Sequence, residues 1–230
     1  MPVFVLVHSP LAGPYTWEPV AIELRKRGYE VALPHLTNSE VDGRRYWEQH
    51  ADTIVRTARS LSPRQTVVLV GHSGAGVLLP VAGQSLAAEC RYIFVDSDLP
   101  MDGKSRLDHF APEDAEAFRR AAIGGYIPPW TEDRLERAIP DPDIRHRFVS
   151  ELVPVPLAVY EELIPVPPGW PDGPCAYLSF AGTGAYGMAV SESKSRGWPT
   201  VEMPGEHFQL LVDPPGVADA LVDLVERLGA

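Results

Sequence analysis

The clearest chemical signal in the chain is a glycine-rich turn with a central serine, Gly-His-Ser-Gly-Ala at residues 71–75. Apolar runs at 67–70 and 77–79 flank it, which predicts a strand, a tight turn and a helix. In a nucleophile elbow of the type G-x-S-x-G, such a turn raises the serine hydroxyl above the sheet. Ala75 replaces the last glycine of that pattern but is also small. A phosphate loop is the alternative, yet no lysine follows the glycines as that loop requires. We therefore predict that Ser73 is a nucleophile.

The elements around this serine follow a regular pattern. Short apolar runs alternate with amphipathic segments of helical period, and continuous apolar runs are typical of parallel strands covered on both faces. The expected strands are 3–7, 30–33, 66–70, 92–95, 176–180 and 200–203, and the clearest helices lie near 17–28, 46–61 and 217–228. We predict an α/β fold with a doubly wound, mostly parallel sheet.

The segment of residues 101–174 interrupts this alternation. Eleven prolines lie between Pro128 and Pro174. Each proline fixes φ and lacks an N–H donor, so this stretch cannot form one long helix or a central strand. We predict that residues 1–100 and 175–230 form the core, and that residues 101–174 form a proline-rich helical lid inserted in it.

Beyond the elbow, the chain opens with His-Ser-Pro-Leu-Ala-Gly-Pro-Tyr-Thr-Trp at 8–17 and continues with Gly-Tyr-Glu-Val-Ala-Leu-Pro at 28–34. With these motifs it resembles the α/β-hydrolase superfamily over nearly its whole length, and within it the small lidded esterases and plant hydroxynitrile lyases. Their opening His, followed nine residues later by Trp, is kept. The resemblance implies that His207 is the catalytic base and that His8 and His72 are structural.

The remaining histidines, His35, His50, His109 and His146, lie in polar or lid segments, where we expect solvated side chains.

The acid of the triad departs from the common pattern of these relatives. They carry an Asp after the strand that corresponds to 176–180, but here the loop 181–187 has no carboxylate, and Glu192 follows only in a predicted helix. Without an acid partner the histidine loses its tautomer control, which costs up to about 10⁴ in kcat. Asp96 follows the preceding strand, a position similar to that of the acid in some lipases, and it keeps the order Ser, Asp, His. We predict Asp96 as the acid; the alternatives are Asp98, or neither, with Asp96 only capping a turn.

Two N–H donors are expected to stabilise the oxyanion of an acyl-transfer reaction. One is the N–H of Gly74, the residue after the nucleophile. The resemblance places the second at Pro10, but proline has no N–H. Either the Leu11 N–H in a shifted loop or the Ser9 hydroxyl must then serve, and hydroxynitrile lyases carry a Thr at the position of Ser9.

Those lyases also carry a Lys right after the catalytic histidine, where this chain has Phe208. The change removes the charge that would stabilise cyanide and leaves an apolar wall, so we do not expect a nitrile lyase.

Aromatic residues of the predicted lid should partly pack on their own core and partly roof a pocket. We expect Pro10, Phe208, Tyr126 and Trp130 to line a pocket for a hydrophobic acyl or alcohol group. Seven arginines between 106 and 147 are expected on solvated faces, so no clamp for a carboxylate or phosphate is predicted. The arginines are Arg106, Arg119, Arg120, Arg134, Arg137, Arg145 and Arg147.

Composition excludes several classes of protein. The 230 residues are 45% hydrophobic and 22% charged, as in soluble globular proteins, and the net charge of −11 argues against nucleic acid and anionic membranes as partners. Cys90 and Cys175 show no zinc or disulfide spacing. The N-terminus lacks the features of a signal peptide, so we expect a cytoplasmic protein, a monomer or homodimer, without metal or cofactor.

These observations predict a serine hydrolase that cleaves a small apolar carboxylic ester, thioester or lactone through an acyl-enzyme. The unusual loop at 8–11 leaves a non-hydrolytic reaction open, such as acyl transfer, elimination or cyclisation. A catalytically silent ligand-binding protein of the same fold is the third alternative, because fold alone does not determine function.

Overall fold

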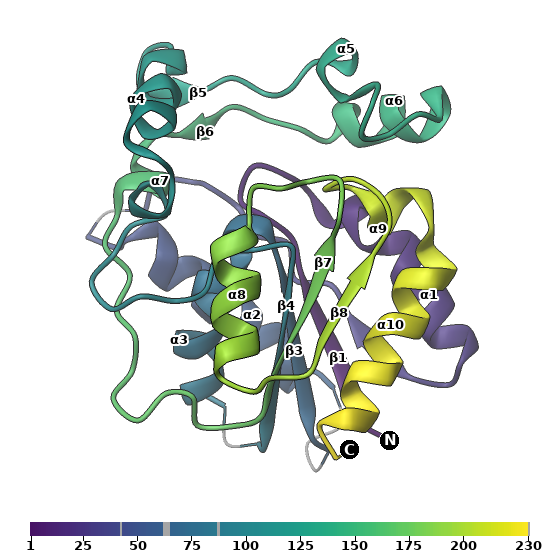
Figure 1. Ribbon diagram of the computed structural model, residues 1–230. Coiled ribbons are helices and arrows are strands. Elements are labelled where there is room, and N and C mark those ends of the chain that lie inside the picture. The colour runs from purple at the N-terminus through teal and green to yellow at the C-terminus, as the bar shows by residue number, and fades with distance from the viewer. Residues whose placement is uncertain (42, 62–64, 87, 230) are drawn as a thin grey trace.

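The centre of the molecule is a parallel sheet. The computed structural model describes residues 1–41, 43–61, 65–86 and 88–229. Within these residues, six strands pair in the order β2-β1-β3-β4-β7-β8, and every recorded pair is parallel (Figure 1). The strands are β1 Val3–Val7, β2 Glu30–Ala32, β3 Val67–His72, β4 Cys90–Val95, β7 Cys175–Phe180 and β8 Thr200–Met203. The predicted doubly wound α/β fold is confirmed.

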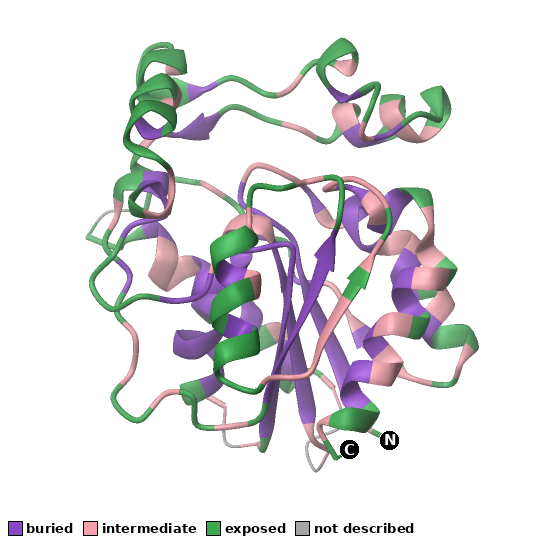
Figure 2. Cartoon of the chain, viewed as in Figure 1, coloured by how far each residue is buried: buried purple, intermediate pink, exposed green. Residues whose placement is uncertain are grey.

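Helices cover both faces of the sheet, so β1, β3, β4 and β7 are buried along their whole length (Figure 2). Alternate residues of each strand, such as Phe4 and Ile93, pack with α1 and α10 on one face, while Val5 and Phe94 belong to the cluster of the opposite face. One face carries α1 Glu18–Lys26, α9 Gln209–Val212 and α10 Pro214–Arg227, and the other α2 Tyr46–Arg59, α3 Leu79–Gln84 and α8 Gly187–Ser195 (Figure 1).

The segment between β4 and β7 lies over the carboxyl ends of the strands (Figure 1). It contains η3 Leu107–His109, α4 Pro112–Ala121, β5 Tyr126–Ile127, α5 Glu132–Leu135, α6 Pro142–Ser150, β6 Val155–Pro156 and α7 Ala158–Glu161. Pro112 and Pro142 begin α4 and α6, where a missing N–H costs nothing. The helices of this segment are short, and β5 and β6 form a small antiparallel sheet.

Two smaller features complete the fold. A short 3-10 helix, η1 Pro14–Thr16, precedes α1, and another, η2 Ser73–Leu78, precedes α3. Cys90 and Cys175 are free, buried thiols, and burial raises the pKa of Cys90 to about 11 and that of Cys175 to about 12. No helix in the part of the chain that the structure describes is long and apolar enough to cross a membrane.

Candidate active site

Ser73 occupies a strained turn at the carboxyl end of β3. Its φ is +56°, a left-handed conformation that non-glycine residues rarely adopt. The turn is tight because glycines flank it: a Cβ at Gly71 would lie 3.0 Å from the Cα of Gly76. Ala75 is fully buried, and its methyl group fits where the common pattern has glycine. The local geometry is that of a nucleophile elbow, in which the serine side chain stands above the sheet.

The structure brings Asp96 and His207 together. Asp96 Oδ2 accepts a hydrogen bond from His207 Nδ1 at 2.7 Å, and its Oδ1 accepts one from the Phe180 N–H at 3.3 Å. The Asp96 side chain is 2% exposed, against 21% for His207. With Nδ1 donating to the carboxylate, Nε2 of His207 carries a lone pair and can accept a proton.

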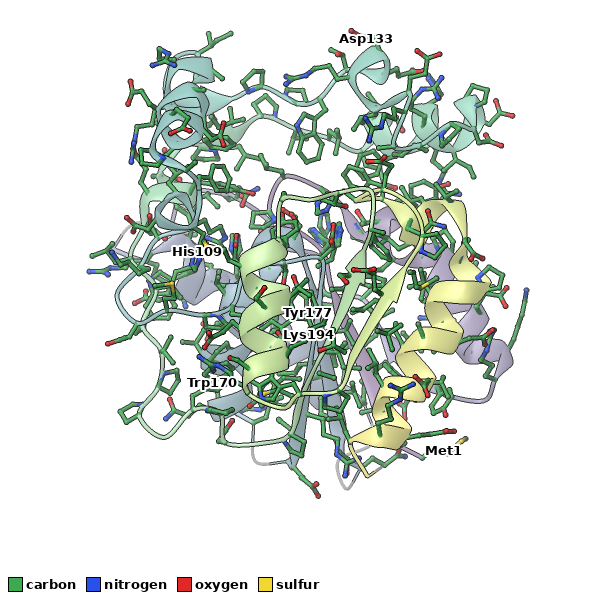
Figure 3. The ribbon with its side chains drawn as sticks, in the orientation of Figure 1. Met1, His109, Asp133, Trp170, Tyr177 and Lys194 are labelled. Carbon is green, nitrogen blue, oxygen red and sulfur yellow. The ribbon has the colours of Figure 1, made fainter. Side chains whose placement is uncertain are left out.

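The backbone of Asp96 is itself strained, with a φ of +43°. Its N–H donates to Leu178 O at 2.8 Å, and the next residue, Ser97, is held on both sides by Tyr177. The Tyr177 hydroxyl accepts from the Ser97 N–H at 3.0 Å and donates to Ser97 O at 2.6 Å. Tyr177 is fully buried on β7 (Figure 3), so this sheet strand fixes the turn that aims the carboxylate at His207.

His72 holds the backbone of His207 in place. Its Nε2 donates to the backbone carbonyl of His207 at 3.0 Å, and the two rings lie 4.4 Å apart between centroids. Burial, first, and the nearby His207 lower the pKa of His72 well below its usual value. His72 is thus a neutral ring that anchors the loop after β8, the structural role that the resemblance implied.

His8 anchors the loop at the end of β1. Its Nε2 accepts from the Leu36 N–H at 3.1 Å, so Nδ1 carries the proton and donates to Ser9 O at 2.8 Å. Burial lowers the pKa of His8 to about 4, which keeps the ring neutral. In the same loop, Pro10 O accepts from Asn38 Nδ2 at 2.9 Å.

The expectation of four solvated histidines is wrong for two of them. His35 and His146 are exposed. His50, in contrast, is 1% exposed, and burial lowers its pKa to about 3. The His109 side chain is only 7% exposed and lies where the insertion meets the core (Figure 3). Both were assigned to the surface because their neighbours in sequence are polar, while the packing that buries them comes from distant segments.

The oxyanion loop does not present a free backbone donor in the expected place. The Leu11 N–H points to Ser9 Oγ at 3.4 Å, and Ser9 is 2% exposed. Ser9 Oγ in turn lies 3.4 Å from the Tyr160 hydroxyl. The candidates Ser9, Leu11 and Gly74 are therefore close together, because a Cβ at Gly74 would lie 3.4 Å from Ser9 Oγ.

Tyr186 is a site residue that the sequence reasoning missed. Its hydroxyl lies 3.4 Å from Ser73 Oγ, within hydrogen-bond distance. Its ring lies 5.6 Å from that of His207 at an angle of 22°. Burial raises the pKa of Tyr186, so the phenol remains protonated. Tyr186 lies in the loop 181–187, which lacks the expected acid. The absence of that acid was the only feature of the sequence that could have drawn attention to Tyr186.

Arg106 was expected on a solvated face, and this expectation is wrong. The residue is 2% exposed, its Nε donates to Gly74 O at 2.8 Å and its Nη1 donates to Val159 O at 2.7 Å. Burial lowers the pKa of the guanidinium to about 10, which still leaves it charged at neutral pH. A buried cation thus links the insertion to Gly74, the residue after Ser73.

Asp98, the alternative acid, points elsewhere. Its Oδ1 lies 4.0 Å from His109 Nδ1, and its side chain is 24% exposed. Burial raises the pKa of Asp98 to about 7.

The Asp98 pKa predicts a pH-dependent stability. Between about pH 4 and 7 the folded chain keeps a proton that the unfolded chain releases, so the free energy of unfolding falls as pH rises through this window. Asp98→Asn should remove that slope. From pH 5 to pH 8 the wild-type Tm should fall by roughly 5 °C more than that of the variant, measured by differential scanning fluorimetry. Parallel curves would show that Asp98 titrates normally.

The predicted pocket residues divide into three groups. Phe208 is buried against His207, with ring centroids 5.1 Å apart, and Trp130 packs on Phe208 at 5.7 Å. Pro10 lines a cavity of about 540 Å³ on the outer side of the oxyanion loop. Tyr126 is 41% exposed on β5, and no recorded contact of the described residues joins it to Ser73 or His207.

A larger cavity, of about 1060 Å³, lies between α8 and the insertion and has Tyr186 in its wall. Its wall is partly apolar, with Leu99, Phe110 and Ala189, but it also contains the carboxylates of Asp98 and Asp108. The four residues expected to line an apolar pocket, Pro10, Phe208, Tyr126 and Trp130, are not among the residues that line this cavity. Among the residues that the structure describes, no group of three His, Cys, Asp or Glu side chains is placed to hold a metal ion.

Comparisons with known proteins show similarity over most of the chain. A sequence model described as "Alpha/beta hydrolase family" matches residues 4–222. The chain is similar to Methylesterase 8 of Arabidopsis thaliana, with 28% identity over 159 residues, which are 64% of this chain and 58% of that protein. It is also similar to Alpha-hydroxynitrile lyase of the same plant, with 27% identity over 103 residues, 42% of this chain and 40% of that one. The matches thus span less than two thirds of these relatives.

Among solved structures, an extracellular alpha/beta-hydrolase from a Paenibacillus species has the same fold. It superposes with a TM-score of 0.82 at 23% identity, and the match covers 97% of this chain and 99% of that one.

Proposed function

Since the chain belongs to the alpha/beta hydrolase family, in its small esterase and hydroxynitrile-lyase-like branch, we propose that it is a serine esterase. Its substrate is a small apolar carboxylic ester, thioester or lactone, cleaved through an acyl-enzyme. The observation that carries the proposal is the 2.7 Å bond between His207 Nδ1 and Asp96, in a chain whose elbow presents Ser73. Similarity to Methylesterase 8 supports ester hydrolysis.

The mechanism starts with Ser73. Its Oγ attacks the carbonyl carbon while its proton passes to His207 Nε2, and the carbonyl π electrons move to the oxygen. Asp96 holds the tautomer of His207 and stabilises the imidazolium that forms. Catalytic hydrogen bonds often tighten only with substrate bound, so the Ser73 hydroxyl exchanges its contact with Tyr186 for His207 at that stage.

The second half of the reaction uses the same groups. His207 gives its proton to the leaving alcohol or thiol, and the acyl group stays on Ser73 as an ester. Water, deprotonated by His207, then attacks this ester, and the acid leaves as Ser73 recovers its proton. The insertion of residues 101–174 acts as a lid over these steps, and the cavity with Tyr186 in its wall admits the substrate.

The test is a substrate panel in water labelled with ¹⁸O. Methyl and ethyl esters of short and aromatic acids and matched thioesters should release their alcohol or thiol, and lactones should open to the hydroxy acid. Mass spectrometry should find one ¹⁸O in each acid product. Cyanohydrins should release no cyanide, because Phe208 stands where the lyases carry a charge. Binding of these compounds without any turnover would contradict the proposal and indicate a silent binding protein.

Elimination is the second candidate, and one observation favours it. The Leu11 N–H is used inside the loop and Pro10 has none, so the backbone of this loop is poorly arranged to stabilise an oxyanion. An elimination in which His207 removes a proton from carbon forms no tetrahedral oxyanion. An unsaturated product, formed without ¹⁸O incorporation, would identify that reaction.

A further inference from the structure

The oxyanion hole lacks one backbone donor, and a side chain fills the same space. Pro10 has no N–H, and the Leu11 N–H donates to Ser9 Oγ. On the other side of Ser9 Oγ lies the hydroxyl of Tyr160, at 3.4 Å. The hydroxyl lies beside the residue that follows the nucleophile as well, since a Cβ at Gly74 would lie 3.1 Å from it.

Tyr160 comes from the insertion and is rigidly held. It lies on α7 and is 3% exposed. Its ring packs on Phe118 with centroids 4.8 Å apart and on Phe110 at 6.4 Å. The Arg106 guanidinium lies 5.8 Å from the ring centroid, and this cation is bonded to Gly74 O and to Val159 O, beside Tyr160 in sequence. A rotamer fixed in this way makes the hydroxyl a preorganised group.

The hydrogen bonds among Leu11, Ser9 and Tyr160 use two of their three donors and leave one O–H for a further acceptor. Leu11 N–H donates to Ser9 Oγ, and one hydroxyl of the Ser9–Tyr160 pair donates to the other. When Ser9 donates, the Tyr160 O–H is free for a further acceptor. Burial, first, raises the pKa of Tyr160, so the phenol is a neutral donor at physiological pH. The nearby Arg106 adds a positive charge on the side where negative charge develops.

We propose that Tyr160 is the second oxyanion donor of this site, a lid hydroxyl oriented by Ser9 in place of the N–H that Pro10 lacks. The inference rests on the proposed function. When Ser73 Oγ bonds to the carbonyl carbon, the carbonyl oxygen becomes negative and accepts hydrogen bonds from the Gly74 N–H and the Tyr160 O–H. No proton leaves Tyr160, and these bonds weaken again as the alcohol departs and the carbonyl reforms.

Three variants test the assignment. Tyr160→Phe removes only the hydroxyl and keeps the ring packing, and it should lower kcat about 10²-fold with little change in KM, because a donor used only at the transition state is lost. Ser9→Ala should cost about tenfold, because Tyr160 loses its orienting partner. The double variant should lie within about threefold of Tyr160→Phe, since the two hydroxyls act as a unit. Tyr29→Phe, which removes the same atom near the amino end of β2, should stay within about twofold.

A readout besides turnover is the affinity for a trifluoromethyl ketone, which forms a tetrahedral adduct with an active serine. Its inhibition constant should rise about as much as kcat falls in Tyr160→Phe, while the Tm stays near that of the wild type.

The outcomes separate this inference from the proposed function. A wild type that hydrolyses esters, with Tyr160→Phe as active as the control, overturns the role of Tyr160 alone. A large loss in Ser9→Ala with little loss in Tyr160→Phe assigns the donor to Ser9 and overturns the inference too. A wild type that neither turns over esters nor binds the ketone covalently refutes the proposed function itself.

Discussion

Ser73→Ala should lower kcat for the best ester by about 10⁶, and His207→Gln should lower it by a similar factor. The reason is that neither group acts alone. A serine hydroxyl is a weak nucleophile without a base, and the imidazole has no proton to accept without the serine. The double variant should therefore be no slower than either single variant. Steady-state rates on the purified variants measure these losses, provided that contamination by wild-type enzyme is below about one part in 10⁷.

A matched control is available on α8. Ser191 is exposed and bonds only locally, to Gly187 O at 2.9 Å, so Ser191→Ala should keep full activity. Losses that multiply in the Ser73 and His207 double variant would show that the two residues contribute independently and would contradict the assigned relay.

Asp96→Asn should lower kcat by about 10⁴, because an amide at this position can present its NH₂ to Nδ1 and hold the opposite tautomer of His207. The Ser73 hydroxyl would then face a protonated Nε2. Asp98→Asn is the matched control: the same isosteric change two residues away, at a carboxyl whose Oδ1 lies 4.0 Å from His109 Nδ1, should cost less than about tenfold. Rates of ester hydrolysis for the two variants, with their Tm values, measure the difference.

Equal and modest losses in both variants would contradict the assignment of Asp96. A large loss in Asp98→Asn alone would move the acid role to that residue, although the structure aims its carboxylate at His109.

The sheet was predictable because its four central strands, β1, β3, β4 and β7, are mostly apolar and buried on both faces, and hence visible without knowledge of their neighbours. The ends of the strands were harder to predict. β3 continues through Gly71 and His72, which have low strand propensity, because both residues pair with β4 at Phe94 and Val95. The small sheet of β5 and β6 was missed for a related reason. Its strands are two residues long and one contains Pro156, so no period-2 pattern exists to recognise.

The residues on the core motifs were predictable, whereas those that reach the site from elsewhere were not. Ser73, Asp96 and His207 each follow a strand, and the carboxyl ends of parallel strands meet at one edge of a sheet. Tyr160 and Arg106 belong to the insertion. Tyr160 follows the apolar run 157–159, which predicts burial but no contact with the site, and Arg106 stands mostly among polar residues. Their burial depends on how short helices pack over the strands, which no local period encodes.

The most direct test of the account is the intact mass of the protein after incubation with a fluorophosphonate probe, followed by peptide mapping. The account predicts one adduct per chain, located on Ser73 and absent from Ser73→Ala. A folded wild-type protein that gains no adduct, or gains it on another residue, would contradict an activated serine at position 73.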